Sequence, residues 1–142
     1  MDLHVSIEVA FYTILLILLI EEESMDRIGL GKKAEEAAAL YLRNQGYKII
    51  ERNFRCSFGE MDIIAEDGDV LVFVEVRSRR SSAYGLPQET VAWLKQQKLR
   101  RLAVYYLKIK NAGEKKCRFD VIGILFNQNA EIKSLDLIQD AF

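Results

Sequence analysis

The sequence predicts an α/β domain whose central mixed β-sheet is flanked by helices, in the order α-β-β-β-α-β-β. Two stretches carry apolar residues at helical spacing, and five shorter ones are rich in β-branched and aromatic residues. An Asp-Gly pair joins two of these five stretches. The chain has 142 residues, half of them apolar, which suits one compact domain with a single core.

The first expected helix covers residues 28–45. Gly46 follows it at a position typical of a helix C-cap, and a short strand is expected at residues 47–52. The apolar positions at helical spacing are Leu30, Ala34, Ala37, Ala38, Tyr41 and Leu42.

Residues 60–66 and 70–77 are expected to form a β-hairpin around Asp67-Gly68. A turn centred there places Asp62 opposite Phe73. One face of this hairpin is wholly apolar and must pack against another layer. That face carries Met61, Ile63, Ala65, Val70, Val72, Val74 and Val76.

The second expected helix covers residues 87–107 and begins near Pro87. Two further strands are expected at residues 118–126 and 130–137. Trp93, Tyr105 and Tyr106 are expected to be core or dimer contacts. The residues of this helix available for burial are Leu94, Leu99, Leu102, Ala103 and Tyr106.

The composition excludes several kinds of catalytic site. His4 is the one histidine, so a Ser-His-Asp triad, a Cys-His dyad and histidine-bound zinc are excluded from the body of the domain. Cys56 and Cys117 are too few for a disulfide framework and fit a reducing cytosol. Carboxylates, lysines and arginines remain, and carboxylates suit hard cations such as magnesium.

The net charge of −1 hides an uneven distribution. Residues 1–24 hold five acidic and no basic side chains, which leaves 20 basic and 16 acidic ones in residues 25–142. Residues 77–110 alone hold nine Lys or Arg against Glu89, a local net of +8. Such a patch suits a polyanionic partner, and its alternative is an ordinary solvated helix face.

Residues 9–20 form an apolar run without charge, VAFYTILLILLI. It is shorter than the roughly 20 residues that a membrane-spanning helix needs. It is either a short anchor or interfacial helix, an extra element packed on the domain, or a segment upstream of a true start at Met25. We favour the last alternative, with an N-terminal extension at 1–24 and the domain at 25–142.

The hairpin face opposite the apolar one carries Glu60, Asp62, Glu75 and Arg77 at one end. Buried carboxylates are costly unless they are paired or bound to a cation. The cluster is therefore either a divalent metal site or a set of ion pairs with Arg77 and Arg79. Glu60 has the further alternative of pairing with Arg52 or Arg55.

The run GEMDIIAEDGDVLVFVEVRSRR contains the pattern D-(x12)-E-x-R. This pattern resembles the D…(D/E)-x-K core of the PD-(D/E)XK nuclease superfamily. Residues 25–142 more closely resemble the YraN-like uncharacterised family, which is similar to archaeal Holliday-junction resolvases. The further matching stretches are GKKAEEAAALYL at Gly31, Glu51-Arg52-Asn53, FVEVRSRRSSAYG at Phe73, Lys95-Gln96-Gln97-Lys98, CRFDV at Cys117 and Asp140-Ala141-Phe142.

The resemblance implies a restriction-endonuclease-like core and metal-dependent hydrolysis of DNA phosphodiesters. It assigns Glu35, Asp62 and Glu75 as acidic ligands of Mg²⁺ or Mn²⁺, with the backbone carbonyl of Val76 as a further ligand. Arg77 stands where these nucleases most often have lysine. Arginine can stabilise the charged transition state, but it cannot act as a base.

The resemblance also implies a nucleic-acid partner, in particular branched DNA, a two-fold homodimer and a cytoplasmic location, without a small-molecule cofactor or a membrane. The residues expected to bind flanking phosphates are Arg79, Arg80, Lys95, Lys98 and Arg101. Arg118 and Asp120 are expected to form an ion pair beside the site.

Two other functions stay open. Arg77 favours a catalytically inactive nucleic-acid-binding or protein-interaction module of the same fold. The second alternative is a membrane-tethered interaction module, which is suggested by the apolar run of residues 9–20.

Overall fold

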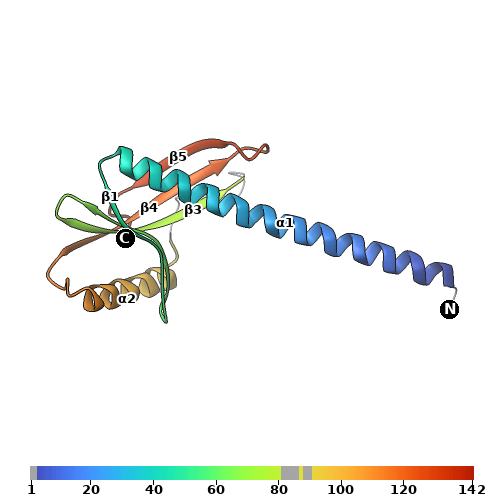
Figure 1. The fold of residues 1–142 in the computed structure, drawn as a ribbon, viewed down its shortest axis with the longest axis horizontal. Coiled ribbons are helices and arrows are strands. Elements are labelled where there is room, and N and C mark those ends of the chain that lie inside the picture. The colour runs from blue at the N-terminus through green and yellow to red at the C-terminus, as the bar shows by residue number, and fades with distance from the viewer. Residues whose placement is uncertain (1–2, 81–86, 88–90) are drawn as a thin grey trace. The chain divides into compact units, whose positions relative to one another are not determined.

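The structure, a computed structural model, describes the backbone of residues 3–80, 87 and 91–142. Its elements follow the predicted order, which confirms the α/β class. They are α1 (Leu3–Asn44), β1 (Lys48–Cys56), β2 (Gly59–Asp67), β3 (Val70–Arg79), α2 (Trp93–Ile109), β4 (Lys116–Phe126) and β5 (Ile132–Ile138). The strands form one mixed sheet in the order β1-β2-β3-β4-β5, in which only β3 and β4 pair in parallel among the described strands (Figure 1).

The chain divides into two compact units, Met1–Lys33 and Ala34–Phe142. Helix α1 belongs to both, because the helix expected to begin at residue 28 is continuous from Leu3. The apolar run of residues 9–20 is helical within the first unit. Among the described residues, no helix combines the length and the apolar character needed to cross a membrane.

Strands β2 and β3 form the predicted hairpin, but their register differs from the predicted one by two residues. The turn consists of residues 68–69, and Phe73 lies opposite Ile64 instead of Asp62. A shift of two residues leaves the facing of the side chains unchanged, because their directions alternate with a period of two. The shift brings Asp62 closer to Glu75 along the strand pair.

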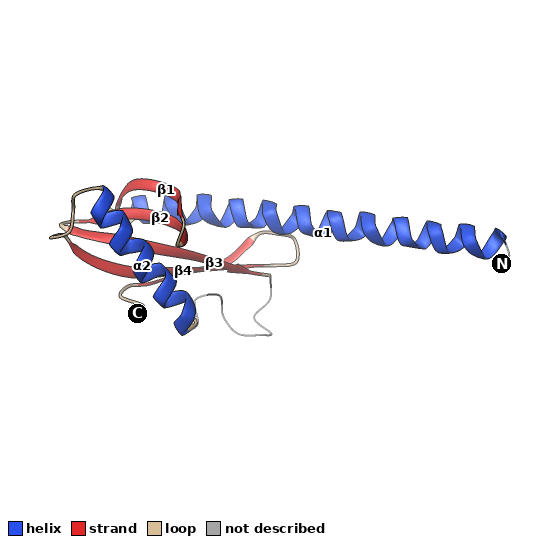
Figure 2. Ribbon diagram, turned by 90° about the horizontal axis from the view of Figure 1, so that it is seen from below, coloured by secondary structure: helices blue, strands red, loops and turns tan. Residues whose placement is uncertain are grey.

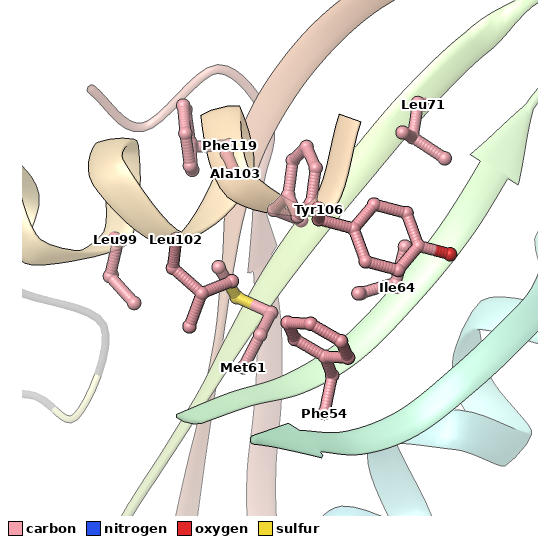
Figure 3. Close-up of a cluster of buried hydrophobic side chains, with 10 residues drawn as sticks. Phe54, Met61, Ile64, Leu71, Leu99, Leu102, Ala103, Tyr106 and Phe119 are labelled. Carbon is pink, nitrogen blue, oxygen red and sulfur yellow. The ribbon is translucent and has the colours of Figure 1, made fainter. Parts of the chain in front are cut away.

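Helix α2 packs on one face of the sheet through a cluster of buried apolar side chains (Figure 3). The Tyr106 ring meets those of Phe54 and Phe73 edge-on, with ring centroids 5.1 and 5.8 Å apart. Met61, predicted on the opposite face, also packs in this cluster, beside its cross-strand partner Phe54 on β1. The other members are Ile64, Leu71, Leu99, Leu102, Ala103 and Phe119.

The opposite face of the sheet carries Ile63, Val72 and Val74, all fully buried. Within the second unit, the C-terminal part of α1 lies over this face, whereas α2 covers the other (Figures 1 and 2). The small side chains of Ala34 and Ala38 are buried there. The central strand β3 is therefore covered on both faces, as is usual for a strand with a parallel neighbour.

Helix α2 begins at Trp93 rather than near Pro87, because Val91 and Ala92 are not helical. Residues 88–90, where the predicted helix also ran, lie outside the described part of the chain. Trp93 and Leu94 are 68% and 70% exposed, so the expected burial of Leu94 is wrong and Trp93 is not part of the core. The expected burial of the other four residues is confirmed: Leu99, Leu102, Ala103 and Tyr106.

Arg118 and Asp120 form the expected ion pair, with Arg118 Nε donating to Asp120 Oδ1 at 2.8 Å. The pairing of β3 with β4 places Asp120 on the sheet face opposite Glu75, so this pair does not lie beside the acidic cluster. The Tyr47 hydroxyl donates to Asp120 Oδ2 at 3.0 Å, and the Asp140 N–H donates to Oδ1 at 3.0 Å. The buried carboxylate of Asp120 thus ties the start of β1 and the C-terminal segment to β4.

Candidate active site

The candidate site lies where β2 and β3 stop pairing. Their register runs from the turn to Ile63 opposite Val74 and does not continue to the next residues. Beyond it, the N–H of Val76 donates to Asp62 Oδ2 at 2.7 Å, so a side chain takes the place of the neighbouring strand. This hydrogen bond holds the Asp62 carboxylate between the ends of the two strands.

Glu75 is one of two charged side chains that the described part of the chain buries almost completely. Its Oε1 accepts a hydrogen bond from Lys95 Nζ, and the two form an ion pair. Glu75 comes from the buried middle of β3, whereas Lys95 comes from the first turn of α2 and stays half-exposed. The helix therefore supplies a cation directly to the carboxylate at the split end of the hairpin.

The electrostatics of the site are dominated by excess negative charge. The pKa of Asp62 is raised to about 7, first by burial and then by the nearby carboxylates of Glu75 and Glu35. The Val76 N–H and the Lys95 ammonium act in the opposite direction but do not cancel this effect. Such a site favours the binding of an additional cation or the retention of a proton.

Glu35 is half-buried near the end of α1 and acts on Asp62 through its charge. With its amide nitrogen turned toward the two glutamates, Asn53 donates to Glu35 Oε2 and Glu60 Oε1, each at 3.2 Å. Asn53 adopts a left-handed backbone with φ of 53°, which asparagine tolerates better than most residues. Sequence reasoning assigned it no role, although it lies within the Glu51-Arg52-Asn53 stretch.

The surrounding ion pairs show which arginine pairs with Glu60. Arg55 Nε lies 3.4 Å from Glu60 Oε2, which confirms Arg55 as the partner of Glu60. Arg52 instead pairs with Glu36, with Nη1 and Oε1 2.9 Å apart.

The residues suit a divalent cation in type, because Asp62 and Glu75 offer hard carboxylate oxygens at a site of excess negative charge. Over the described ranges, no group of three or more His, Cys, Asp or Glu side chains is arranged to hold a metal ion. The metal assignments of Glu35, Asp62, Glu75 and Val76 stay predictions. The Lys95 ammonium is a cation that contacts Glu75 directly.

A cavity of about 490 Å³ opens beside these carboxylates and is large enough for a phosphate group. Asp62 and Glu75 line it on one side, and Lys95 and Lys98 line it on the other. Phe58, from the turn between β1 and β2, lies at its edge. Glu60 lines the cavity as well, so it combines three carboxylates with two lysines, which suits an anion held beside a metal ion.

The remaining predicted basic residues occupy different places. Arg77 and Arg79 are half-buried on β3, and Arg80 follows the strand and is exposed. Arg101 is exposed on α2 and lines a neighbouring groove rather than the acidic cavity. Of the predicted phosphate-binding residues, the structure thus brings Lys95 and Lys98 to the acidic cavity.

Comparison with known proteins finds close relatives over most of the chain. A family model described as "Uncharacterised protein family UPF0102" matches residues 34–124, which include Glu35, Asp62 and Glu75. A "UPF0102 protein" of Pelotomaculum thermopropionicum is 49% identical over 113 residues, covering 80% of this chain and 94% of the relative. A protein of the same name from Desulforamulus reducens is 49% identical over 120 residues, covering 83% and 98%. A third, from Syntrophus aciditrophicus, is 48% identical over 112 residues, covering 79% and 87%.

Proposed function

The chain belongs to the uncharacterised protein family UPF0102, and we propose that it is a nucleic-acid-binding protein with metal-dependent endonuclease activity on DNA. One observation carries the proposal: Asp62 and Glu75 converge where β2 and β3 part, beside an anion-sized cavity lined by lysines. The resemblance of this segment to the PD-(D/E)XK core supports the same reaction. The family description does not name an activity, so the proposal rests on the site.

In this proposal, Asp62 and Glu75 hold one Mg²⁺ or Mn²⁺ ion, with Glu35 adding negative charge nearby. An ion held there would lower the pKa of a coordinated water and offset the charge of the scissile phosphate. The Val76 N–H fixes one oxygen of Asp62, so the carboxylate is oriented before substrate arrives. Lys98, which is exposed on the cavity wall, contacts a phosphate that flanks the scissile one.

We assign to Lys95 the role that the lysine of the D…(D/E)-x-K motif usually has, although Arg77 occupies the position of that lysine in the sequence. The Lys95 ammonium contacts Glu75. An ammonium beside this carboxylate can orient the attacking water and stabilise charge that develops on the phosphate. Unlike arginine, a lysine near a metal site can also lose its proton.

The test is a cleavage assay with the full chain in Mg²⁺ or Mn²⁺. The labelled substrates are a four-way junction, a flap, a single strand and a plain duplex. Cleavage by the wild type that disappears in both Asp62→Asn and Glu75→Gln supports the proposal. Glu66→Gln is the matched control, because Glu66 also lies on β2 but pairs with Lys115 outside the site, at 2.6 Å.

A second function, binding without cleavage, is favoured by Arg77 and by the missing third ligand among the described residues. In that case, the wild type binds DNA in both metals and cleaves none of the four substrates. Absence of both binding and cleavage would overturn both functions for these substrates.

A further inference from the structure

A second groove lies along the exposed side of α2, next to the acidic cavity. It has a volume of about 400 Å³. Aromatic side chains from two elements meet there, Phe58 and Tyr105, whose ring centroids are 6.0 Å apart. The remaining lining residues are Gln97, Arg100, Arg101, Val104 and Lys108. We call these seven residues the Phe58 groove.

The Phe58 groove is chemically suited to a nucleotide. Three of its seven lining residues are cationic, and none is acidic. Its aromatic rings are accessible, since Phe58 and Tyr105 are 42% and 37% exposed. Exposed rings beside arginines bind nucleic-acid strands by stacking on bases while the cations contact phosphates.

One cationic lining residue, Arg100, also contacts aromatic rings outside the groove. The Arg100 guanidinium lies over the rings of Phe119 and Phe142, 5.5 and 5.6 Å from their centroids. Those two rings are themselves stacked, with centroids 4.8 Å apart. Neither ring lines the groove, so Arg100 borders the groove while its guanidinium packs on residues outside it.

The groove and the acidic cavity share one side chain. Phe58 lines both of them. A strand whose phosphate lies beside Asp62 and Glu75 can therefore continue past Phe58 into the groove without leaving the surface of α2.

We propose that the Phe58 groove binds an unpaired nucleotide of the DNA strand that is held at the acidic cavity. The proposal rests on the proposed function and specifies its substrate class. A base within a duplex is stacked between its neighbours, so only an unpaired base can offer its face to Phe58 and Tyr105. Substrates with unpaired nucleotides, such as flaps and gapped junctions, therefore bind more tightly than a continuous duplex.

The test measures binding by fluorescence anisotropy in EDTA, where cleavage does not interfere. The probes are a fluorescein-labelled duplex and the same duplex with a short single-stranded flap. We expect Phe58→Ala to weaken binding of the flap probe roughly 5- to 100-fold, the range for one lost stacking contact. Binding of the continuous duplex is expected to change little.

Three variants separate stacking from other effects. Phe58→Trp keeps an aromatic face and is expected to retain tight flap binding. Phe58→Leu keeps apolar volume without an aromatic face and is expected to behave like Phe58→Ala. Ile50→Ala is the matched control, because Ile50 is an equally exposed apolar residue on β1 outside the groove.

The outcomes distinguish the two proposals. If the wild type binds neither probe in EDTA and none of the DNA substrates in Mg²⁺ or Mn²⁺, the proposed function itself fails. If the wild type binds and cleaves DNA but Phe58→Ala binds both probes like the wild type, only the groove assignment is overturned. A change of oligomeric state in Phe58→Ala, measured by light scattering, would instead assign the groove to a contact between copies of the chain and overturn the proposal.

Discussion

The Asp62 carboxylate is subject to opposing influences that decide its charge. Burial and the carboxylates of Glu75 and Glu35 favour the protonated form, whereas the Val76 N–H and Lys95 favour the ionised form. The balance raises the pKa of Asp62 to about 7. A divalent cation bound at the same carboxylate would compete with the proton and lower this pKa.

Replacing Asp62 by asparagine should make metal-free protein more stable relative to the wild type as the pH rises. A carboxyl group whose pKa rises from 3.8 to about 7 on folding stabilises the folded state below the lower value. That contribution is lost as the pH rises through the higher value. When the pH is raised from about 4 to about 8, the free energy of unfolding of Asp62→Asn should therefore rise by on the order of 2–4 kcal/mol relative to that of the wild type.

Urea unfolding of both proteins in EDTA, across the same pH range, measures this difference. Glu66→Gln serves as the control, since the pKa of Glu66 is lowered by its hydrogen bond with Lys115. Its contribution to stability is lost toward acid, the opposite direction. A difference in unfolding free energy between Asp62→Asn and the wild type that stays constant or falls as the pH rises would contradict the prediction.

The assignment of Lys95 over Arg77 makes a separate prediction. Lys95→Gln should lower kcat for cleavage roughly 100- to 1000-fold with little change in KM, as expected for loss of a group that stabilises transition-state charge. Adding Arg77→Lys to the Lys95→Gln variant should not restore its activity. Lys133→Gln is the control, because Lys133 is an exposed lysine on β5, away from the site. A larger loss in Arg77→Gln than in Lys95→Gln would reverse the assignment.

The two central acids could be predicted from sequence, but the cation beside them could not. Asp62 and Glu75 lie on one hairpin, so strand alternation alone places both on one face. Lys95 lies 20 residues further along the chain, after residues 81–86 and 88–90, which lie outside the described structure. Its contact with Glu75 depends on how α2 packs on the sheet, which local patterns do not determine. Phe58 carried only a weak signal, an aromatic residue beside Gly59 in a turn.

At the scale of elements, local patterns identified the strands better than their register. Asp67-Gly68 and Gly68-Asp69 are both plausible turns, and the two registers place the same side chains on the same faces. The predicted start of α2 failed for a related reason, because Pro87 is compatible with a helix start without requiring one. The Ala92 cap has no side-chain hydrogen bond to mark it.

The network on the opposite sheet face joins three elements through Asp120. Arg118 donates to both of its carboxylate oxygens, and Tyr47 and the Asp140 N–H complete its hydrogen bonds. Asp120 is fully buried, so its removal leaves the Arg118 guanidinium without its main partner. The hydrogen bond with Asp120 also raises the pKa of Arg118, which therefore stays charged.

Asp120→Ala should destabilise the fold by about 3–5 kcal/mol, the usual cost of removing one partner of a buried ion pair. Urea unfolding measures this loss. Asp69→Ala is the matched control, because Asp69 and Lys116 are both largely exposed and lie 3.8 Å apart. Such a surface pair contributes at most about 1 kcal/mol. Equal stability of the two variants would show that the network does not secure the C-terminal segment.

Across the whole molecule, charge is distributed so that overall net charge is a poor guide to partners. The chain has a net charge of −1, yet residues 77–110 carry a net +8. Exposed cations of α2 line both the acidic cavity and the Phe58 groove. The composition predicted this patch, but only the fold divides it between two neighbouring sites.

The division of this patch predicts how DNA binding depends on salt. Lys98, Arg100, Arg101 and Lys108 line the two sites, and four phosphate contacts give a slope of log affinity against log salt of about −3 to −4. Replacing Arg101 by glutamine should reduce the magnitude of this slope by about 1 on every DNA probe.

Phe58→Ala should instead weaken flap binding at all salt concentrations and leave the slope unchanged, because stacking releases no counterions. Anisotropy titrations at several salt concentrations measure both quantities. A slope near zero for the wild type would mean that the cations of α2 do not contact DNA, and the positive patch would then be an ordinary solvated helix face.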